Sequence, residues 1–230
     1  MKIIKYIKWI FHFTKLLINP AGHIKSLIFL GDELTKSKPA TIGAQKLLHR
    51  PKLREMYANR DGMKPISLSV LSSYSHGTLG YHVYRFYHIQ NLDVYPVDRF
   101  DHLTESQYIV ERTRKLHDIL HVVLGYGTDL IGEAKLNAYV LNQSRMPIPF
   151  LIVVGIGIKY LFRHPLQFHT LISELEEGWK MGDRTFCFLE QDWDCLLQLS
   201  LDEVCNNFVK DIQLQEESDV YASTLYTSNC

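Results

Sequence analysis

The chain has 230 residues, which is enough for one sizeable domain with its own hydrophobic core. Hydrophobic residues make up 46% of the sequence and charged residues 22%, a balance that argues against disorder and against several membrane spans. Basic and acidic residues number 25 each, so no excess of positive charge indicates a nucleic-acid partner.

The cysteines do not form a recognisable framework for disulfides or for metal binding. All four lie in the last quarter of the chain and no pair has CxxC spacing: Cys187, Cys195, Cys205 and Cys230. A secreted disulfide scaffold would be denser in cysteine. We therefore expect reduced cysteines that serve packing in a cytosolic protein.

Residues 1–18, MKIIKYIKWIFHFTKLLI, are predicted to form a basic amphipathic helix. Lysines recur there at roughly helical spacing among large apolar residues, and no acidic residue precedes Asp32. Such a helix can lie in a membrane interface, and it can equally dock on its own domain. Polar interruptions of the apolar run and the lack of a cleavage motif disfavour a signal peptide.

The next segments are predicted to be helical as well. Residues 41–59 have helical character, and Pro51 should divide them into two short helices or kink them. An aromatic-rich helix should follow Thr78, whose side chain can cap it. Thr104 and Gln107 have the spacing of a capping box at the start of a long helix, which glycines should end after residue 124.

A further helix should run from about Asp129 to Asn142, and prolines separate it from the apolar run at residues 150–162. That run is too short for a comfortable membrane span, so a buried helix is the default expectation and the lining of a ligand site is the alternative. The last third predicts three helices with a turn near Gly182 and Asp183. Beyond residue 214 we expect a frayed tail.

These patterns predict an all-α protein with a single helical domain. We expect three parts: residues 1–30 as the basic amphipathic N-terminal helix, for which membrane contact is one option, residues 31–212 as the helical domain, and residues 213–230 as a flexible tail.

Four potential metal ligands lie within an apolar, glycine-broken segment. His117 and His121 are four residues apart and therefore share a face of the long helix. Asp118 lies near that face, and Glu133 can close the site if the next helix packs back. Buried carboxylates need a partner, and two nitrogens with two carboxylates suit zinc, iron or manganese better than magnesium.

The spacing of these four residues also fits sites without a metal and metal sites of different kinds. Many HxxxH pairs are surface histidines or hydrogen-bonded core histidines. A zincin would have glutamate where Asp118 stands, because that carboxylate acts as a general base. An HD-type phosphohydrolase would need an earlier histidine and a later aspartate, for which His102 and Asp129 are the candidates, without specific support.

The segment HDILHVVLGYGTDLIGE resembles the HDxxH-x11-E signature of the coenzyme Q (ubiquinone) biosynthesis proteins of the Coq-four family. SHGTLGYHVYRF, RTRKLHD and GWKMGDRTFCFLEQDWDCLLQLSLDEV resemble further segments of that family, so the likeness extends over about residues 40–212. The family usually has glutamate where Lys115 stands and a Trp-Glu pair where Trp193 and Asp194 stand. No clear mitochondrial presequence is present, which is typical of a bacterial-type homologue.

The resemblance implies an all-helical protein in which His117, Asp118, His121 and Glu133 bind one divalent metal ion between two helices. Zinc is the preferred ion, with iron, manganese or magnesium as alternatives. It also implies an internal apolar tunnel or groove for a polyprenyl lipid or prenylated quinone precursor. Expected partners are a membrane surface and other quinone-biosynthesis proteins, with a homodimer as an option and no nucleic acid. In a bacterium the protein would be cytoplasmic, peripheral on the inner face of the membrane.

The apolar residues that flank the signature fit such a ligand. Tyr81, Tyr84 and Phe86 precede the signature and the run at 150–162 follows it. In most helical domains such residues fill the core. Gly157 nevertheless removes side-chain volume in mid-helix, where glycine costs about 1 kcal/mol relative to alanine, and it would leave room for a neighbour or a ligand.

Two hypotheses about function follow from the resemblance. The first is an enzyme, a lyase or oxidative decarboxylase that supports C1 decarboxylation and hydroxylation of prenylated 4-hydroxybenzoate derivatives, with the four ligands acting through the metal. The second is a non-catalytic isoprenoid-binding scaffold that organises quinone-biosynthesis enzymes at the membrane. Both stay open, because no nucleophile–base pair or cofactor fingerprint accompanies the signature.

Overall fold

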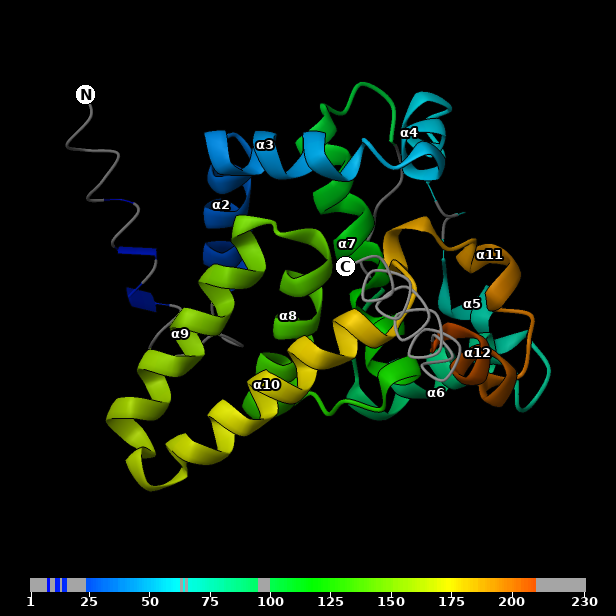
Figure 1. Ribbon diagram of the computed structural model, residues 1–230. Helices are drawn as coiled ribbons and strands as arrows, with labels where there is room; N and C mark the ends of the chain where they lie inside the picture. The colour runs from blue at the N-terminus through cyan, green and yellow to red at the C-terminus, as the bar shows by residue number, and fades with distance from the viewer. Residues whose placement is uncertain are drawn as a thin grey trace, which may run out of the picture.

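The computed structural model describes residues 24–62, 64, 66–94 and 100–209, together with positions 8, 11, 12, 14 and 15. The regular secondary structure of these residues is helical, and within them strand pairing is limited to isolated bridges (Figure 1). The α-helices are α2 (Ile24–Thr35), α3 (Lys38–Leu47), α4 (Pro51–Ala58), α5 (Leu68–Ser72), α6 (Leu79–Gln90), α7 (Glu105–Leu124), α8 (Leu130–Ser144), α9 (Pro147–Arg163), α10 (Phe168–Arg184), α11 (Trp193–Leu196) and α12 (Leu201–Phe208).

The helix boundaries around the candidate site follow from local capping, as predicted. The Thr78 side chain caps α6, and Thr104 with Gln107 forms a complete capping box at the start of α7. Gly125, with φ of 66°, ends α7 in the left-handed conformation that glycine adopts without strain. Pro51 begins α4 and so separates it from α3, which confirms two short helices.

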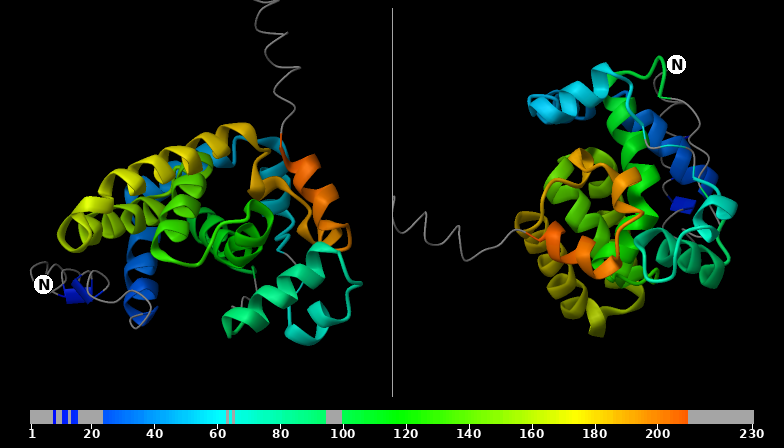
Figure 2. Two further views of the ribbon diagram at one scale, coloured as in Figure 1. Left: turned by 90° about the horizontal axis from the view of Figure 1, so that it is seen from below. Right: turned by 90° about the vertical axis from the view of Figure 1, so that its right-hand side faces the viewer.

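Helix α8 packs along α10, with α9 beside both, and Figures 1 and 2 show these three helices as one side of the molecule. Two glycines of α10 make this packing close. A Cβ atom at Gly178 would clash with the carbonyl oxygen of Lys135, and one at Gly182 would lie 2.7 Å from Cγ of Asn142. Gly182 therefore serves packing inside α10, which ends at Arg184, one residue beyond the turn predicted near Gly182 and Asp183.

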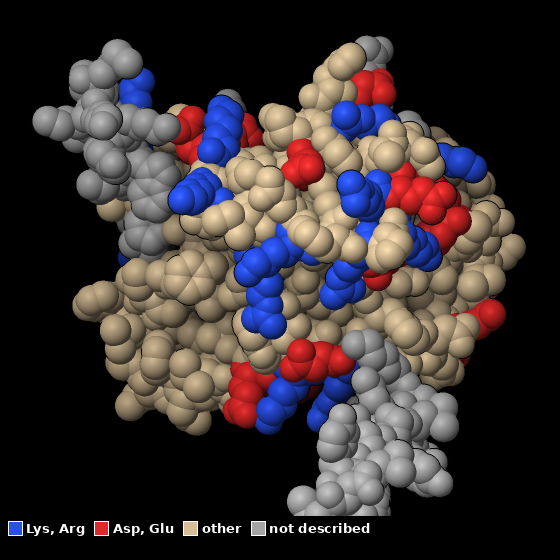
Figure 3. Space-filling model, turned by 45° about the horizontal axis from the view of Figure 1, so that its top comes forward, with Lys and Arg blue, Asp and Glu red and all other residues tan. Residues whose placement is uncertain are grey.

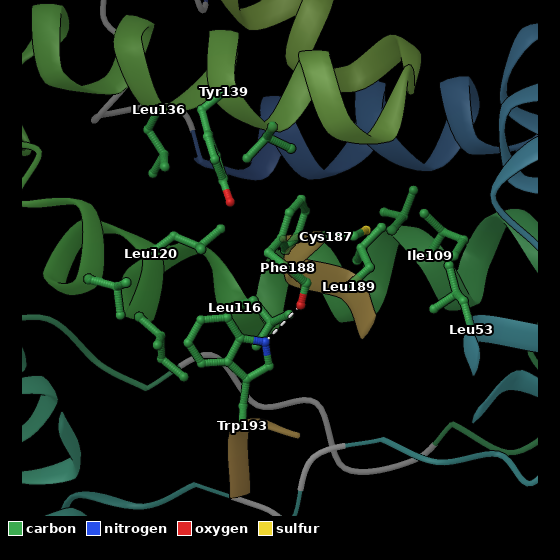
Figure 4. Packing of buried hydrophobic residues seen from close by; sticks show 14 of the residues in the cluster. Leu53, Ile109, Leu116, Leu120, Leu136, Tyr139, Cys187, Phe188, Leu189 and Trp193 are labelled. Atoms are coloured by element: carbon green, nitrogen blue, oxygen red, sulfur yellow. Dashed lines mark hydrogen bonds between the residues drawn. The ribbon is translucent and has the colours of Figure 1, made fainter. Parts of the chain in front are cut away.

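The main core lies between α7, α8 and the segment that follows α10 (Figure 4). Leu116 and Tyr139 are fully buried there against Phe188 and Trp193. The indole Nε1 of Trp193 donates a hydrogen bond of 2.8 Å to the carbonyl oxygen of Phe188, so the ring is buried without an unpaired donor. This core packs against α7, which carries most of the candidate ligands.

The prediction of a buried helix at residues 150–162 is wrong for most of α9. Ile156 and Tyr160 pack against Ala134 and Leu171, whereas much of the opposite side is exposed or half-buried. The apolar composition indicated a helix but could not show that only one side has a protein neighbour. Across the part of the chain that the structure describes, no helix has the length and apolar character needed to span a bilayer.

Most of the predicted N-terminal helix and the whole predicted tail at residues 213–230 lie outside the described residues. Positions 8, 11, 12, 14 and 15 are helical, and the His12 ring contacts Phe29 and Ser26 of α2.

Candidate metal centre

Three potential metal ligands converge where α7 meets α8. His117 and His121 lie one turn apart on α7, and Glu133 lies in the first turn of α8. The turn between the helices is short because Asp129 caps α8, accepting hydrogen bonds from the backbone N–H groups of residues 131 and 132. Gly132 allows the turn to close, since a Cβ atom there would clash with the carbonyl oxygen of Gly127.

The distances between the donor atoms fit a single small cation. Nε2 of His121 lies 3.3 Å from Nε2 of His117 and 3.2 Å from Oε1 of Glu133. Nε2 of His117 lies 3.4 Å from Oε2 of Glu133. Tetrahedral ligands at about 2.0–2.1 Å from zinc are about 3.3 Å apart, so three corners of such a site are present. These three residues could hold a metal ion.

His121 is oriented by contacts on both sides of its ring. Its Nδ1 lies 3.0 Å from the carbonyl oxygen of Tyr126, so Nδ1 must carry the proton to make a hydrogen bond there. Nε2 is therefore the nitrogen that faces Glu133 and His117 and that can bind a metal ion. The ring of Phe86 stacks on the imidazole, with centroids 5.7 Å apart and planes 18° from parallel. The side chain of His121 is only 1% exposed, so its position is fixed by packing.

The fourth predicted ligand, Asp118, is not part of the convergent group. Its Oδ2 accepts a hydrogen bond of 2.7 Å from the buried hydroxyl of Tyr87 on α6. Neighbouring residues on a helix diverge by about 100°, which separates Asp118 from the face that His117 and His121 share. As a metal ligand Asp118 stays a prediction; in this structure its carboxylate is a partner of Tyr87.

In the metal-free protein, Glu133 and His117 each stabilise the charged form of the other. Burial raises the pKa of Glu133, but the hydrogen bonds and charges of His117 and His121 outweigh burial and lower that pKa to about 2. Burial lowers the pKa of His117, but the bond to Glu133 and its charge, with that of Asp118, raise it overall. At neutral pH the carboxylate is therefore ionised and ready to bind a cation.

The three side chains supply fewer ligands than a four-coordinate metal ion needs. Two imidazole nitrogens and one carboxylate leave at least one position of a four-coordinate ion for water or a substrate, as in catalytic zinc sites. The side chains of His117 and Glu133 are each 30% exposed, so the group can be reached from outside. Neither His102 nor Asp129 belongs to it, and nothing in the site favours an HD-type phosphohydrolase.

Tyr87 and Tyr126 are the site residues that the sequence patterns did not reveal. Tyr126 acts through its backbone carbonyl, which no side-chain pattern shows. Tyr87 could have been noticed, because a tyrosine one residue after Phe86 on a predicted aromatic helix can reach a neighbouring carboxylate. Two surface pockets, of about 340 and 520 Å³, are lined elsewhere, by residues of α3, α4, α8 and α10 among others. An apolar tunnel stays a prediction.

The comparisons with known proteins agree with the signature. The family model of "Coenzyme Q (ubiquinone) biosynthesis protein Coq4" matches residues 22–209. Two curated relatives named "Ubiquinone biosynthesis protein COQ4 homolog, mitochondrial" align over 177 residues, the mouse protein at 29% and the rat protein at 31% identity. Each alignment covers 74% of this chain and 61% of the relative, so the chain spans about three fifths of their length.

A solved structure shares the fold. The crystal structure of a candidate ubiquinone biosynthesis protein from Nostoc punctiforme superposes with a TM-score of 0.76, at 23% identity. The match covers 89% of this chain and 97% of the other. It supports the all-helical architecture independently of the signature residues. The family model covers well over half of this chain, which therefore belongs to the family of the coenzyme Q (ubiquinone) biosynthesis protein Coq4.

Proposed function

We propose that this protein is a metal-dependent component of ubiquinone-type quinone biosynthesis. It binds a polyprenylated ring intermediate and supports its C1 decarboxylation and hydroxylation, as a lyase or oxidative decarboxylase. The observation that carries the proposal is the convergence of His117, His121 and Glu133 at 3.2–3.4 Å, in a chain that belongs to the Coq4 family. One divalent ion, zinc in preference to iron, manganese or magnesium, would be held by these residues.

The residues of the site have different roles in this proposal. His121 is the fixed ligand, because the carbonyl oxygen of Tyr126 and the ring of Phe86 hold its imidazole. His117 and Glu133 form the accessible side, where the carboxylate or phenolate of a ring substrate would approach. A bound ion would supply Lewis acidity and, if redox-active, a route to oxygen chemistry. Glu133 is ionised at neutral pH before a substrate binds, because its pKa is lowered to about 2.

The isoprenoid part of the proposal rests on α9. A Cβ atom added at Gly157 would meet nothing within 4 Å, so the helix has open space beside it. Each buried CH₂ group of a prenyl chain contributes about 0.8 kcal/mol, so a long chain could bind without further polar contacts. The predicted helix at residues 1–18 would add contact with the inner face of a bacterial membrane, where other quinone-biosynthesis proteins are the proposed partners.

A second candidate function is a non-catalytic, lipid-binding scaffold. The observation that favours it is that the ligands come from two helices: His117 and His121 belong to α7 and Glu133 to α8. An ion held between them would tie α7 to α8 and stabilise the turn that joins them. In that case the metal would be structural, and the prenyl lipid would be cargo or a signal for assembly.

One experiment separates the two functions. Protein loaded in parallel with zinc, iron or manganese is incubated with prenylated 4-hydroxybenzoate, with and without oxygen, and ring decarboxylation is followed by mass spectrometry. The enzyme hypothesis predicts that the wild type forms the decarboxylated product, that Glu133→Gln forms none, and that the exposed control Glu176→Gln forms as much as the wild type. Tight prenyl-lipid binding without turnover under every metal would favour the scaffold.

A further inference from the structure

The turn between α9 and α10 combines exposed apolar side chains with positive charge. We call residues 161–169, with sequence LFRHPLQFH, the hairpin tip. Phe162 is 79% exposed and Leu166 is 89% exposed, the highest values among the large hydrophobic residues that the structure describes. A surface that holds such side chains together generally marks an interaction site.

The local sequence places these side chains at a protruding end of the molecule. Pro165 prevents α9 from continuing, and the short 3₁₀ turn Pro165–Gln167 reverses the chain into α10. In Figure 1 this turn is at the lower left, at the end of the molecule away from α11 and α12. The view from below in Figure 2 shows the same projection. Phe162 and Leu166 therefore lie at a protruding end, where a membrane or another molecule can contact them.

The charged side chains of the tip and of the helical turn before it are basic. Between Glu133 and Glu174 the chain contains no aspartate and no glutamate. Lys159 and Arg163 belong to this stretch, and neither forms an ion pair with any residue in the described ranges. Figure 3 shows the surface on the α9 side, at the lower left, as a broad uncharged expanse.

We propose that the hairpin tip is a membrane-docking surface that inserts Phe162 and Leu166 into an anionic lipid bilayer. The apolar side chains would enter the headgroup boundary, while Arg163 and Lys159 would meet lipid phosphates. The charge pattern disfavours a second copy of this chain as the occupant. A two-fold symmetric contact centred on the tip would bring the basic residues Lys159 and Arg163 of both copies close together, whereas anionic lipid would neutralise them.

This surface is distinct from the predicted helix at residues 1–18 and does not involve the metal ligands. It deepens the proposed membrane location by naming the part of the folded domain that touches lipid. Failure of metal binding would leave it unaffected, since the tip is exposed and lies outside the core around α7.

The test compares vesicle binding by three full-length proteins in co-sedimentation with phosphatidylcholine vesicles, with and without phosphatidylglycerol. These are wild type, the double variant Phe162→Ser with Leu166→Ser, and the control Ile89→Ser. Ile89 is 67% exposed on α6, so the control removes a comparable exposed apolar side chain without touching the tip. We expect preference for the anionic vesicles, a loss of at least about tenfold in partitioning for the double variant, and no change for the control.

A second measurement locates the contact. In Phe162→Trp, the tryptophan emission should shift to the blue when anionic vesicles are added, and brominated lipid should quench it. Both changes should exceed those of the native tryptophans in the wild type. Wild-type partitioning by the double variant, or a tryptophan at position 162 that brominated lipid does not quench, would overturn the proposal. The proposal would also be overturned if the wild type sediments as a dimer, the double variant sediments as a monomer, and both bind vesicles equally. The tip would then bind a second copy.

Discussion

Replacing Glu133 with glutamine tests whether the carboxylate and the two histidines lie as close together as the structure has them. The substitution keeps the size of the side chain and removes its charge. In the metal-free protein, burial raises the pKa of Glu133 but the hydrogen bonds of His117 and His121 lower it from 4.5 to about 2. Glu133 in turn raises the pKa of His117, against the effect of burial.

The expected magnitude follows from these shifts. Lowering the pKa of Glu133 from 4.5 to about 2 corresponds to roughly 3 kcal/mol of stability, at about 1.4 kcal/mol for each pKa unit. The side chain of Glu133 is 30% exposed, so screening by water reduces this, and we expect about 1–2 kcal/mol.

The pH window follows from the sign of each shift. The pKa of Glu133 is depressed, so its contribution is present above pH 4.5 and is lost as pH falls toward 2. The pKa of His117 is raised, so its contribution is present below pH 6.5 and is lost as pH rises through its folded value. The stabilisation is therefore largest between about pH 4.5 and 6.5.

Urea denaturation followed by circular dichroism, with a chelator present, measures this effect at about pH 5.5 and about pH 9. Glu133→Gln should reduce the free energy of unfolding by about 1–2 kcal/mol at the lower pH and by clearly less at the higher pH. Glu176→Gln, on the exposed side of α10, should change it little at either pH. An equal loss for Glu133→Gln at both pH values would refute the interaction of the carboxylate with the histidines.

Three further predictions concern the ligands. Elemental analysis should find about one divalent ion per chain in the purified protein and a sharply lower metal content in His121→Ala. The exposed control His49→Ala should keep the wild-type metal content, and equal content in both variants would contradict the site. Tyr87→Phe should free Asp118 from its hydroxyl partner and alter the visible spectrum of the Co²⁺-loaded protein, and an unchanged spectrum would show that Asp118 stays away from the ion. Gly157→Leu should abolish the rise in melting temperature that longer prenyl chains produce while leaving metal content intact, whereas shifts independent of chain length in both proteins would argue against an isoprenoid site.

The secondary structure near the site could be predicted because its signals are local. Thr104 and Gln107 cap α7 through contacts within one turn of helix, and Gly125 ends α7 because glycine adopts a positive φ without strain. The pairing of His117 with His121 is equally local, since residues four apart share a helical face whatever surrounds them. The patterns predicted the helical fold and the resemblance added the family, and the structure and the comparisons confirm both.

The remaining features depend on contacts between distant residues. The sequence could suggest Glu133 as a ligand, but only the close turn of α7 into α8, with Gly132 against Gly127, brings its carboxylate to the histidines. Tyr87 reaches Asp118 across 31 residues of sequence, so no local pattern shows that this carboxylate already has a partner. Helix α9 has the composition of a buried helix, yet only tertiary packing decides which side has neighbours. Its free side, with Phe162 exposed, is therefore visible in the structure alone, because burial is a property of the whole fold and not of the residue.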